Sequence, residues 1–255
     1  MAVSEYAERL VLKGGALLAA FGARRPTRDV DFGARDLGND GEGVLDVTRE
    51  IAALSLIHAD GLLFDLVSGA SEVIRAEDYY SGVRVSMAVE LATARVRFHV
   101  DINVGDPVWS APDHVRVPRL LGGEPIGLVG YPLHMVHAEK IVTAVQRGTV
   151  NTRWRDFGDV WTLSREHAGD GDQMQTAIAK VASHRKAELS PLRDVVEGYP
   201  AIAQGKWAAW RRKQRLGDIP ETFGDLLEDF YVLADPAIAG EVKGMRWDSS
   251  AAAWQ

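Results

Sequence analysis

The chain has 255 residues, no cysteine and a formal net charge of −7. Without cysteine it has no structural disulfide, thiolate metal site or cysteine nucleophile. Hydrophobic residues make up 46% and charged residues 25%, as in ordinary globular proteins, and the negative charge argues against nonspecific coating of nucleic acid but allows a local basic patch. The N-terminus carries Glu5 and Glu8, and no stretch approaches the roughly 18 apolar residues of a membrane span, so we expect a cytoplasmic protein without a signal peptide.

The first half of the chain mixes the periodicities of helices and strands. Residues 82–106 alternate strongly between apolar and polar side chains and predict two long strands joined near residues 91–94. The other predicted elements are helices at residues 4–10, 14–21 and 42–55 and strands at residues 28–34 and 62–68. Residues 106–132 are rich in proline and glycine and predict connecting structure with short strands.

From Pro132 onward the pattern is almost entirely helical. Proline suits the first turn of a helix, and the predicted helices cover residues 133–147, 152–166, 173–187, 200–215 and 221–234. The final segment, residues 248–255, is expected to be frayed. The layout therefore predicts an α/β domain at residues 1–130 and a helical domain at residues 131–255.

Asp29 and Asp31 are two residues apart on a predicted strand, so their carboxylates point to one face. Two neighbouring anions repel each other, which indicates that a positive charge belongs between them. Asp101, on a later strand, points away from the apolar side of that strand. Three carboxylates facing one way form an oxygen-rich site suited to Mg²⁺, although a short acidic motif alone is compatible with exposed strand ends.

Gly14 and Gly15 begin a predicted helix. Glycines there let a triphosphate approach the backbone, and the free N–H groups of a helix start favour phosphate. Tight packing between helix and strand is the alternative.

Lys140 lies within a predicted helix, where its point charge could neutralise the β- and γ-phosphates of a nucleotide. A solvated surface lysine is the alternative. Asp156 and Asp159, three residues apart on the next helix, could orient Lys140 or a nucleotide base, or pair with Arg153 and Arg155.

Residues 206–215 hold five cations, with Trp207 and Trp210 on one helical face. Such a combination can bind a nucleic-acid backbone and stack on bases. Alternatively the tryptophans belong to the core and the cations cover the outside.

Several motifs together resemble the AbiEii/AbiGii toxin family within the DNA polymerase β-like nucleotidyltransferases. They are "LKGGALLAAFG", "RPTRDVDF", "HAEKIVTAVQR", "RWRDFGDVW" and the late "KWAAWRRKQRLGDIPETFGDLLEDFYVLADP". They occur in the expected order over most of the chain. Ala16 departs from the threonine or serine common after the glycines, and Thr27 stands where serine commonly precedes the acidic pair. Neither change removes a carboxylate.

The resemblance implies an α+β protein: an N-terminal nucleotidyltransferase fold with a mixed β-sheet flanked by helices, then a helical region closing the active-site cleft. It implies transfer of a nucleoside monophosphate from a nucleoside triphosphate to an acceptor, which would be the 3′ end of tRNA, with translation blocked and a cognate antitoxin as partner. Two Mg²⁺ ions, or Mn²⁺, would be held by Asp29, Asp31 and Asp101. The implied catalytic residues also include Lys140, Asp156 and Asp159, and the implied nucleotide-binding residues are Gly14, Gly15, Thr27 and Lys140.

Two other functions remain open at this stage. The same site could modify a small molecule or a protein, without an RNA surface. The chain could also be a catalytically silent nucleotide-binding module, although the retention of three carboxylates and Lys140 argues against silence.

Overall fold

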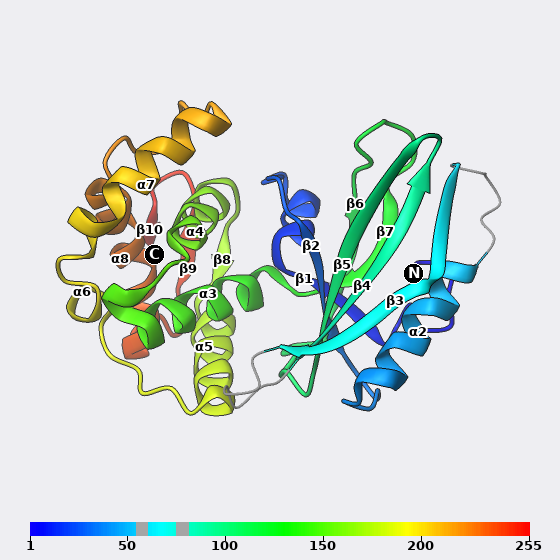
Figure 1. Ribbon diagram of the computed structural model, residues 1–255. Coiled ribbons are helices and arrows are strands. Elements are labelled where there is room, and N and C mark those ends of the chain that lie inside the picture. Colours follow the sequence, from blue (N-terminus) through cyan, green and yellow to red (C-terminus); the bar gives the residue numbers. More distant parts are fainter. Residues whose placement is uncertain (55–60, 75–81) are drawn as a thin grey trace. The chain divides into compact units, whose positions relative to one another are not determined.

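The computed structural model describes residues 1–54, 61–74 and 82–255 (Figure 1). The chain forms two compact units, Met1–Tyr131 and Pro132–Gln255. The first is built on a mixed seven-stranded sheet and the second mainly on helices. The predicted α+β class, with a mixed sheet and a C-terminal helical region, is confirmed. Within the described ranges, no helix has both the length and the apolar character that crossing a membrane requires.

The sheet of the first unit has the strand order β3-β4-β5-β2-β1-β7-β6. Its strands are β1 (Leu10–Lys13), β2 (Asp29–Ala34), β3 (Leu62–Ile74), β4 (Gly82–Leu91), β5 (Ala94–Val104), β6 (Asp113–Val117) and β7 (Ile126–Gly130). The β2–β5 and β1–β7 pairs are parallel, and the remaining pairs are antiparallel. The predicted hairpin of β4 and β5 is confirmed, as are the strand at β2 and the short strands at β6 and β7.

The start of the chain differs from its prediction. Residues 4–9 form turns rather than a helix, and β1 follows at Leu10–Lys13, buried between β2 and β7. Four apolar-rich residues are too few to show a strand period, so the pattern could not separate a central strand from a helix. This matters for the site because β1 places Lys13 beside β2.

The helices of the first unit lie close to their predicted positions. α1 (Gly14–Leu17) continues into the 3₁₀ helix η1 (Leu18–Phe21), where one helix is predicted for residues 14–21. α2 (Gly41–Ala53) is capped by Asp40, whose carboxylate accepts a hydrogen bond from Gly43 N. Leu45 packs beside Gly69 and Met87, so α2 covers part of the face formed by β3 and β4. Ser55, the last residue predicted for this helix, lies outside the described residues.

The second unit packs its helices around an aromatic core. The helices are α3 (Leu133–Arg147), α4 (Trp154–Glu166), α5 (Gly171–Arg185), α6 (Leu192–Val195), α7 (Tyr199–Gln214) and α8 (Phe223–Ala239), with the 3₁₀ helix η2 (Gly148–Val150). The ring of Phe157 lies 5.1–5.8 Å from the rings of Tyr199, Phe223 and Phe230. Trp207 is fully buried against this cluster. Large aromatic groups of this kind dominate the energetics of small cores.

The prediction of a frayed C-terminus is wrong. The chain ends in β9 (Arg246–Asp248) and β10 (Ala253–Trp254), which form a small sheet with β8 (Gly169–Asp170). Trp247 and Trp254 pack with ring centroids 5.4 Å apart, and Trp254 Nε1 donates a hydrogen bond to Leu233 O. The serine and alanine residues of the tail suggest disorder, but the two tryptophans bury enough surface to hold it.

Candidate active site

The register of the sheet places four charged side chains in one row. Arg84 on β4 is paired with Asp101 on β5, Asp101 with Asp31 on β2, and Asp31 with Lys13 on β1. Paired residues point to the same face of a sheet. Asp29, two residues before Asp31, lies on that face as well. The structure therefore brings together Asp29, Asp31 and Asp101, with one cation at each end of the row.

Arg84 forms ion pairs with two of these carboxylates. Its Nε lies 2.7 Å from Asp101 Oδ1 and its Nη2 lies 2.7 Å from Asp101 Oδ2. The same Nη2 lies 3.5 Å from Asp29 Oδ2. Hydrogen bonding to Asp101 raises the pKa of Arg84, while burial partly offsets that effect. Because Asp101 is only 2% exposed, this two-point ion pair balances a charge that would otherwise be buried alone.

Lys13 forms the other end of the row and is deeply buried. Its Nζ lies 2.5 Å from Asp106 Oδ2, and the two side chains are 6% and 3% exposed. The ammonium group also lies 5.3 Å from the centre of the Tyr131 ring. Neither Lys13 nor Arg84 was predicted as a site residue. Arg84 could have been found from its position, since it alternates with Val83 and Val85 on a strand next to that of Asp101.

The glycine pair brings the start of α1 against the acidic pair. Gly14 has φ of +65°, and a Cβ there would lie 2.0 Å from Asp31 Oδ2. A Cβ on Gly15 would lie 3.0 Å from Thr27 Oγ1, which in turn donates a hydrogen bond to Asp29 Oδ1 at 2.9 Å. The close packing of the glycines against Asp31 and Thr27 therefore also helps to place the two carboxylates. Gly14, Gly15 and Thr27 all lie in direct contact with Asp29 or Asp31, or with each other.

The donor set suits a divalent cation in its chemistry. Three carboxylates on adjacent strands offer the oxygen ligands that Mg²⁺ prefers. As the described residues stand, however, no group of three or more carboxylates and histidines closes around a metal position. The guanidinium of Arg84 provides the nearby positive charge by contacting two of the three carboxylates. The residues present thus fit a cation site whose charge is balanced internally.

In the helical unit, Lys140 on α3 is held by both aspartates of α4. Its Nζ lies 2.6 Å from Asp156 Oδ1 and 2.8 Å from Asp159 Oδ2. Burial lowers the pKa of Lys140, but the two carboxylates more than offset this, so the pKa is raised. Arg153 and Arg155, the alternative partners of the aspartates, are exposed. The structure brings Lys140, Asp156 and Asp159 together, and their roles in catalysis remain predictions.

Comparison with known proteins defines the family. The family model described as nucleotidyl transferase AbiEii toxin of a type IV toxin–antitoxin system matches residues 1–229. The chain belongs to the AbiEii family. No curated protein matches the sequence.

Two solved structures are similar at low sequence identity. One is JHP933 from Helicobacter pylori, with 13% identity, a TM-score of 0.46, and coverage of 84% of this chain and 90% of that one. The other is named a putative nucleotidyltransferase from H. pylori, with 13% identity, a TM-score of 0.33, and coverage of 80% of this chain and 88% of that one.

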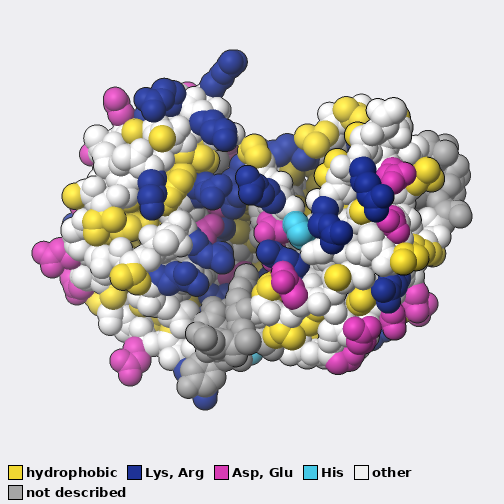
Figure 2. Space-filling model, in the orientation of Figure 1, with side chains coloured by type: hydrophobic (Ala, Val, Ile, Leu, Met, Phe, Trp, Pro, Cys, Tyr) yellow, Lys and Arg dark blue, Asp and Glu magenta, His cyan; other side chains and the backbone are white. Residues whose placement is uncertain are grey.

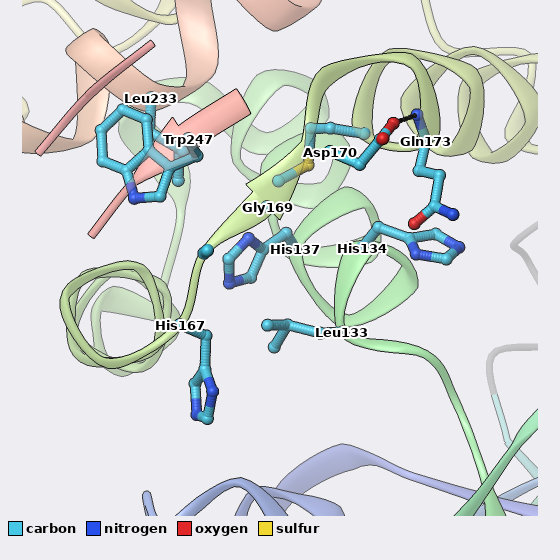
Figure 3. A pocket seen from close by; sticks show the side chains of 11 residues that line it. Leu133, His134, His137, His167, Gly169, Asp170, Gln173, Leu233 and Trp247 are labelled. Atoms are coloured by element: carbon cyan, nitrogen blue, oxygen red, sulfur yellow. Dashed lines mark hydrogen bonds between the residues drawn. The ribbon is translucent and has the colours of Figure 1, made fainter. Parts of the chain in front are cut away.

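The helical unit of this AbiEii-family chain also contains a small pocket beside α3 (Figure 3). Its volume is about 80 Å³. Figure 3 shows the His137 ring reaching in toward Leu133, His167 and Trp247. His137 is 3% exposed, and neither of its ring nitrogens has a hydrogen-bond partner among the described residues. Burial, then the positive charges of Lys140, His167 and His134, lower its pKa to about 3, so the ring is neutral at pH 7.

A basic and aromatic surface lies where α4 and α7 meet. The rings of Trp154 on α4 and Trp210 on α7 are 5.5 Å apart, and the Arg155 guanidinium lies 5.3 Å from the Trp154 ring centre. Figure 2 shows lysine and arginine side chains gathered over this part of the helical unit. We call the exposed parts of these two helices and their ends the α4–α7 surface, and its exposed cations are Arg153, Arg155, Lys206, Arg212, Lys213 and Arg215.

The sequence left open whether the tryptophans of residues 206–215 belong to the core or to the surface. The structure shows that they differ in burial. Trp207 is fully buried, whereas Trp154 and Trp210 are half-buried. Arg211, one of the five cations at residues 206–215, is half-buried and donates a hydrogen bond to Ile219 O. The α4–α7 surface is thus smaller than the basic run in the sequence.

Replacing Gly14 with alanine tests the contact between α1 and the acidic pair. The new Cβ would overlap Asp31 Oδ2 and would adopt a left-handed backbone conformation, so we expect a loss of at least about 2 kcal/mol in the free energy of unfolding. Thermal and urea unfolding followed by circular dichroism measure this. Gly127→Ala is the matched control, because a Cβ there meets no atom within 4 Å. Equal stability of the two variants would contradict the packing described here.

His137 makes a prediction about pH. The unfolded chain takes up a proton on this imidazole near pH 6.5, whereas the native protein takes it up only near pH 3. As the pH is lowered from 6.5 to 3, the free energy of unfolding should therefore fall by about 1.4 kcal/mol per pH unit because of this group alone. His137→Leu should remove that slope. Urea unfolding from pH 4 to 7, read by tryptophan fluorescence, measures it, and parallel curves for both proteins would contradict the burial of a neutral ring.

Proposed function

We propose that this chain is a metal-dependent nucleotidyltransferase that moves a nucleoside monophosphate from a nucleoside triphosphate to RNA. The observation that carries this proposal is the placement of Asp29, Asp31 and Asp101 on one face of adjacent strands. The start of α1 lies directly against Asp31. Membership of the AbiEii nucleotidyltransferase toxins supports the same reaction.

The carboxylates would hold the metal that such a transfer uses. Asp29, Asp31 and Asp101 would ligate two Mg²⁺ ions or Mn²⁺, which stabilise negative charge on the attacking and leaving oxygens. The acceptor hydroxyl oxygen forms a bond to the α-phosphorus, and the bond from that phosphorus to the bridging oxygen breaks. Pyrophosphate leaves with the electron pair, and Asp101 takes up the proton of the hydroxyl.

The remaining predicted residues act on the nucleotide. Gly14 and Gly15 present backbone to the phosphates, and Thr27 fixes Asp29 through its hydrogen bond. We assign Lys140 to the triphosphate because an ammonium group is a compact phosphate ligand. Asp156 and Asp159 hold this ammonium in one place.

The α4–α7 surface supports RNA as the acceptor. Exposed arginine and lysine side chains beside half-buried tryptophans combine phosphate contacts with stacking platforms. The proposed acceptor is the 3′ end of tRNA, whose modification would block translation in the cytoplasm. The type IV toxin–antitoxin family also implies an antitoxin partner.

Labelled transfer tests the reaction. Incubation with α-³²P-labelled nucleoside triphosphates, Mg²⁺ and total RNA should give a labelled tRNA band that requires the metal. Asp31→Asn should reduce the initial rate at least 100-fold, since a neutral amide cannot replace a metal-binding carboxylate. Asp46→Asn, an exposed aspartate on α2, is the control and should keep the rate. Label on protein or on a small molecule would favour those acceptors, and no transfer at all would favour a silent module.

The α4–α7 surface predicts how RNA affinity depends on salt. Replacing Arg212 and Lys213 with glutamine removes two phosphate contacts, so the slope of log affinity against log salt should flatten by about two units. Lys180→Gln with Lys243→Gln is the control, because it removes the same charge from exposed positions outside this surface. Fluorescence anisotropy of labelled tRNA at several salt concentrations measures the slope. Equal slopes in the two double variants would place the RNA surface elsewhere.

A further inference from the structure

We propose that Arg84 is an internal counterion that occupies the cation position of the carboxylate row and is displaced when a divalent metal binds. The proposal rests on the metal-dependent function proposed above and assigns Arg84 a positioning role in it. Its guanidinium holds Asp101 at two points and reaches Asp29 at 3.5 Å. The same carboxylate oxygens would have to turn toward a metal ion.

The two cations of the row differ in whether they can move. The Lys13 side chain is 6% exposed and pairs with Asp106, which is 3% exposed, so its charge is enclosed by the protein. The Arg84 side chain is 31% exposed. It therefore has a path to solvent, and a long flexible stem can carry its charge there. Arg84 is the member of the row that can leave.

The geometry of Arg84 also explains the arrangement of the carboxylates. A planar guanidinium fork binds both oxygens of one carboxylate, and here it directs both oxygens of Asp101 toward β4. Without a positive charge, Asp29, Asp31 and Asp101 would repel one another on adjacent strands. Arg84 thus reduces the repulsion among the three carboxylates until a metal ion takes its place.

The test compares Mn²⁺ affinity in four proteins: wild type, Arg84→Gln, Arg84→Lys and Arg95→Gln. Arg95 is the matched control, because it lies on the same sheet face and pairs with Asp65 and Glu90 away from the row. Isothermal titration calorimetry and electron paramagnetic resonance of free Mn²⁺ measure binding directly, without reference to activity.

Displacement predicts a specific order of affinities. Arg84→Gln should bind Mn²⁺ at least about tenfold more tightly than wild type, because the guanidinium charge that competes with the metal is removed. Arg84→Lys should also bind more tightly, since lysine keeps the charge but lacks the two-point fork. Arg95→Gln should match wild type. Arg84→Gln that binds Mn²⁺ no more tightly than wild type would show that Arg84 does not compete with the metal, and would overturn the proposal.

A measurement on the wild-type protein covers the case in which Arg84→Gln does not fold. The Nε–H resonance of Arg84, identified by its loss in Arg84→Lys, should shift on Mg²⁺ addition as its bond to Asp101 breaks. An unchanged resonance at saturating metal would overturn the displacement of Arg84 while leaving the metal-dependent function intact. Absence of metal binding in all four proteins would overturn both.

Discussion

The first unit depends on one electrostatic constraint, the repulsion between carboxylates on the adjacent strands β2 and β5. The register places Asp31 beside Asp101 and Asp29 two residues away on the same face. In water such anions would keep apart, but the sheet fixes their spacing, so the repulsion has to be balanced by cations. Lys13 and Arg84 lie at the two ends of this row. Balance of charge, rather than hydrophobic burial, therefore determines which polar residues this face can carry.

The short link between β1 and α1 shows how the backbone meets that constraint. The carboxylate of Asp31 occupies the space where a side chain at residue 14 would begin, so only glycine fits, and its positive φ turns the chain directly into the helix. Lys13, the residue before it, points toward the buried Asp106. One dipeptide thus supplies a buried cation on β1 and the sharp turn from β1 into α1.

Residue patterns in the sequence predict the carboxylates but not their partners. Strict alternation on β2 and β5 was enough to place Asp29, Asp31 and Asp101 on one face and to indicate that a positive charge belongs between them. The identity of that charge depends on strand order, because Arg84 approaches Asp101 only after β4 pairs with β5. Strand order is nonlocal information that periodicity does not contain. The same limit explains the missed β1 and the ordered C-terminus, where Trp254 depends on a distant carbonyl at Leu233.

The cations of this acidic protein fall into two groups that follow from their partners. Arg84, Lys13 and Lys140 are each held by carboxylates within 2.5–2.8 Å, and each fixes the position of a buried or half-buried acidic group. Arg153, Arg212 and Lys213 are exposed and form no ion pair with any acidic residue in the described part of the chain. An exposed cation without an ion pair can offer its full charge to the phosphates of a nucleic acid. The net charge of −7 therefore does not exclude RNA binding, since α4, α7 and their ends carry exposed cations of this second group.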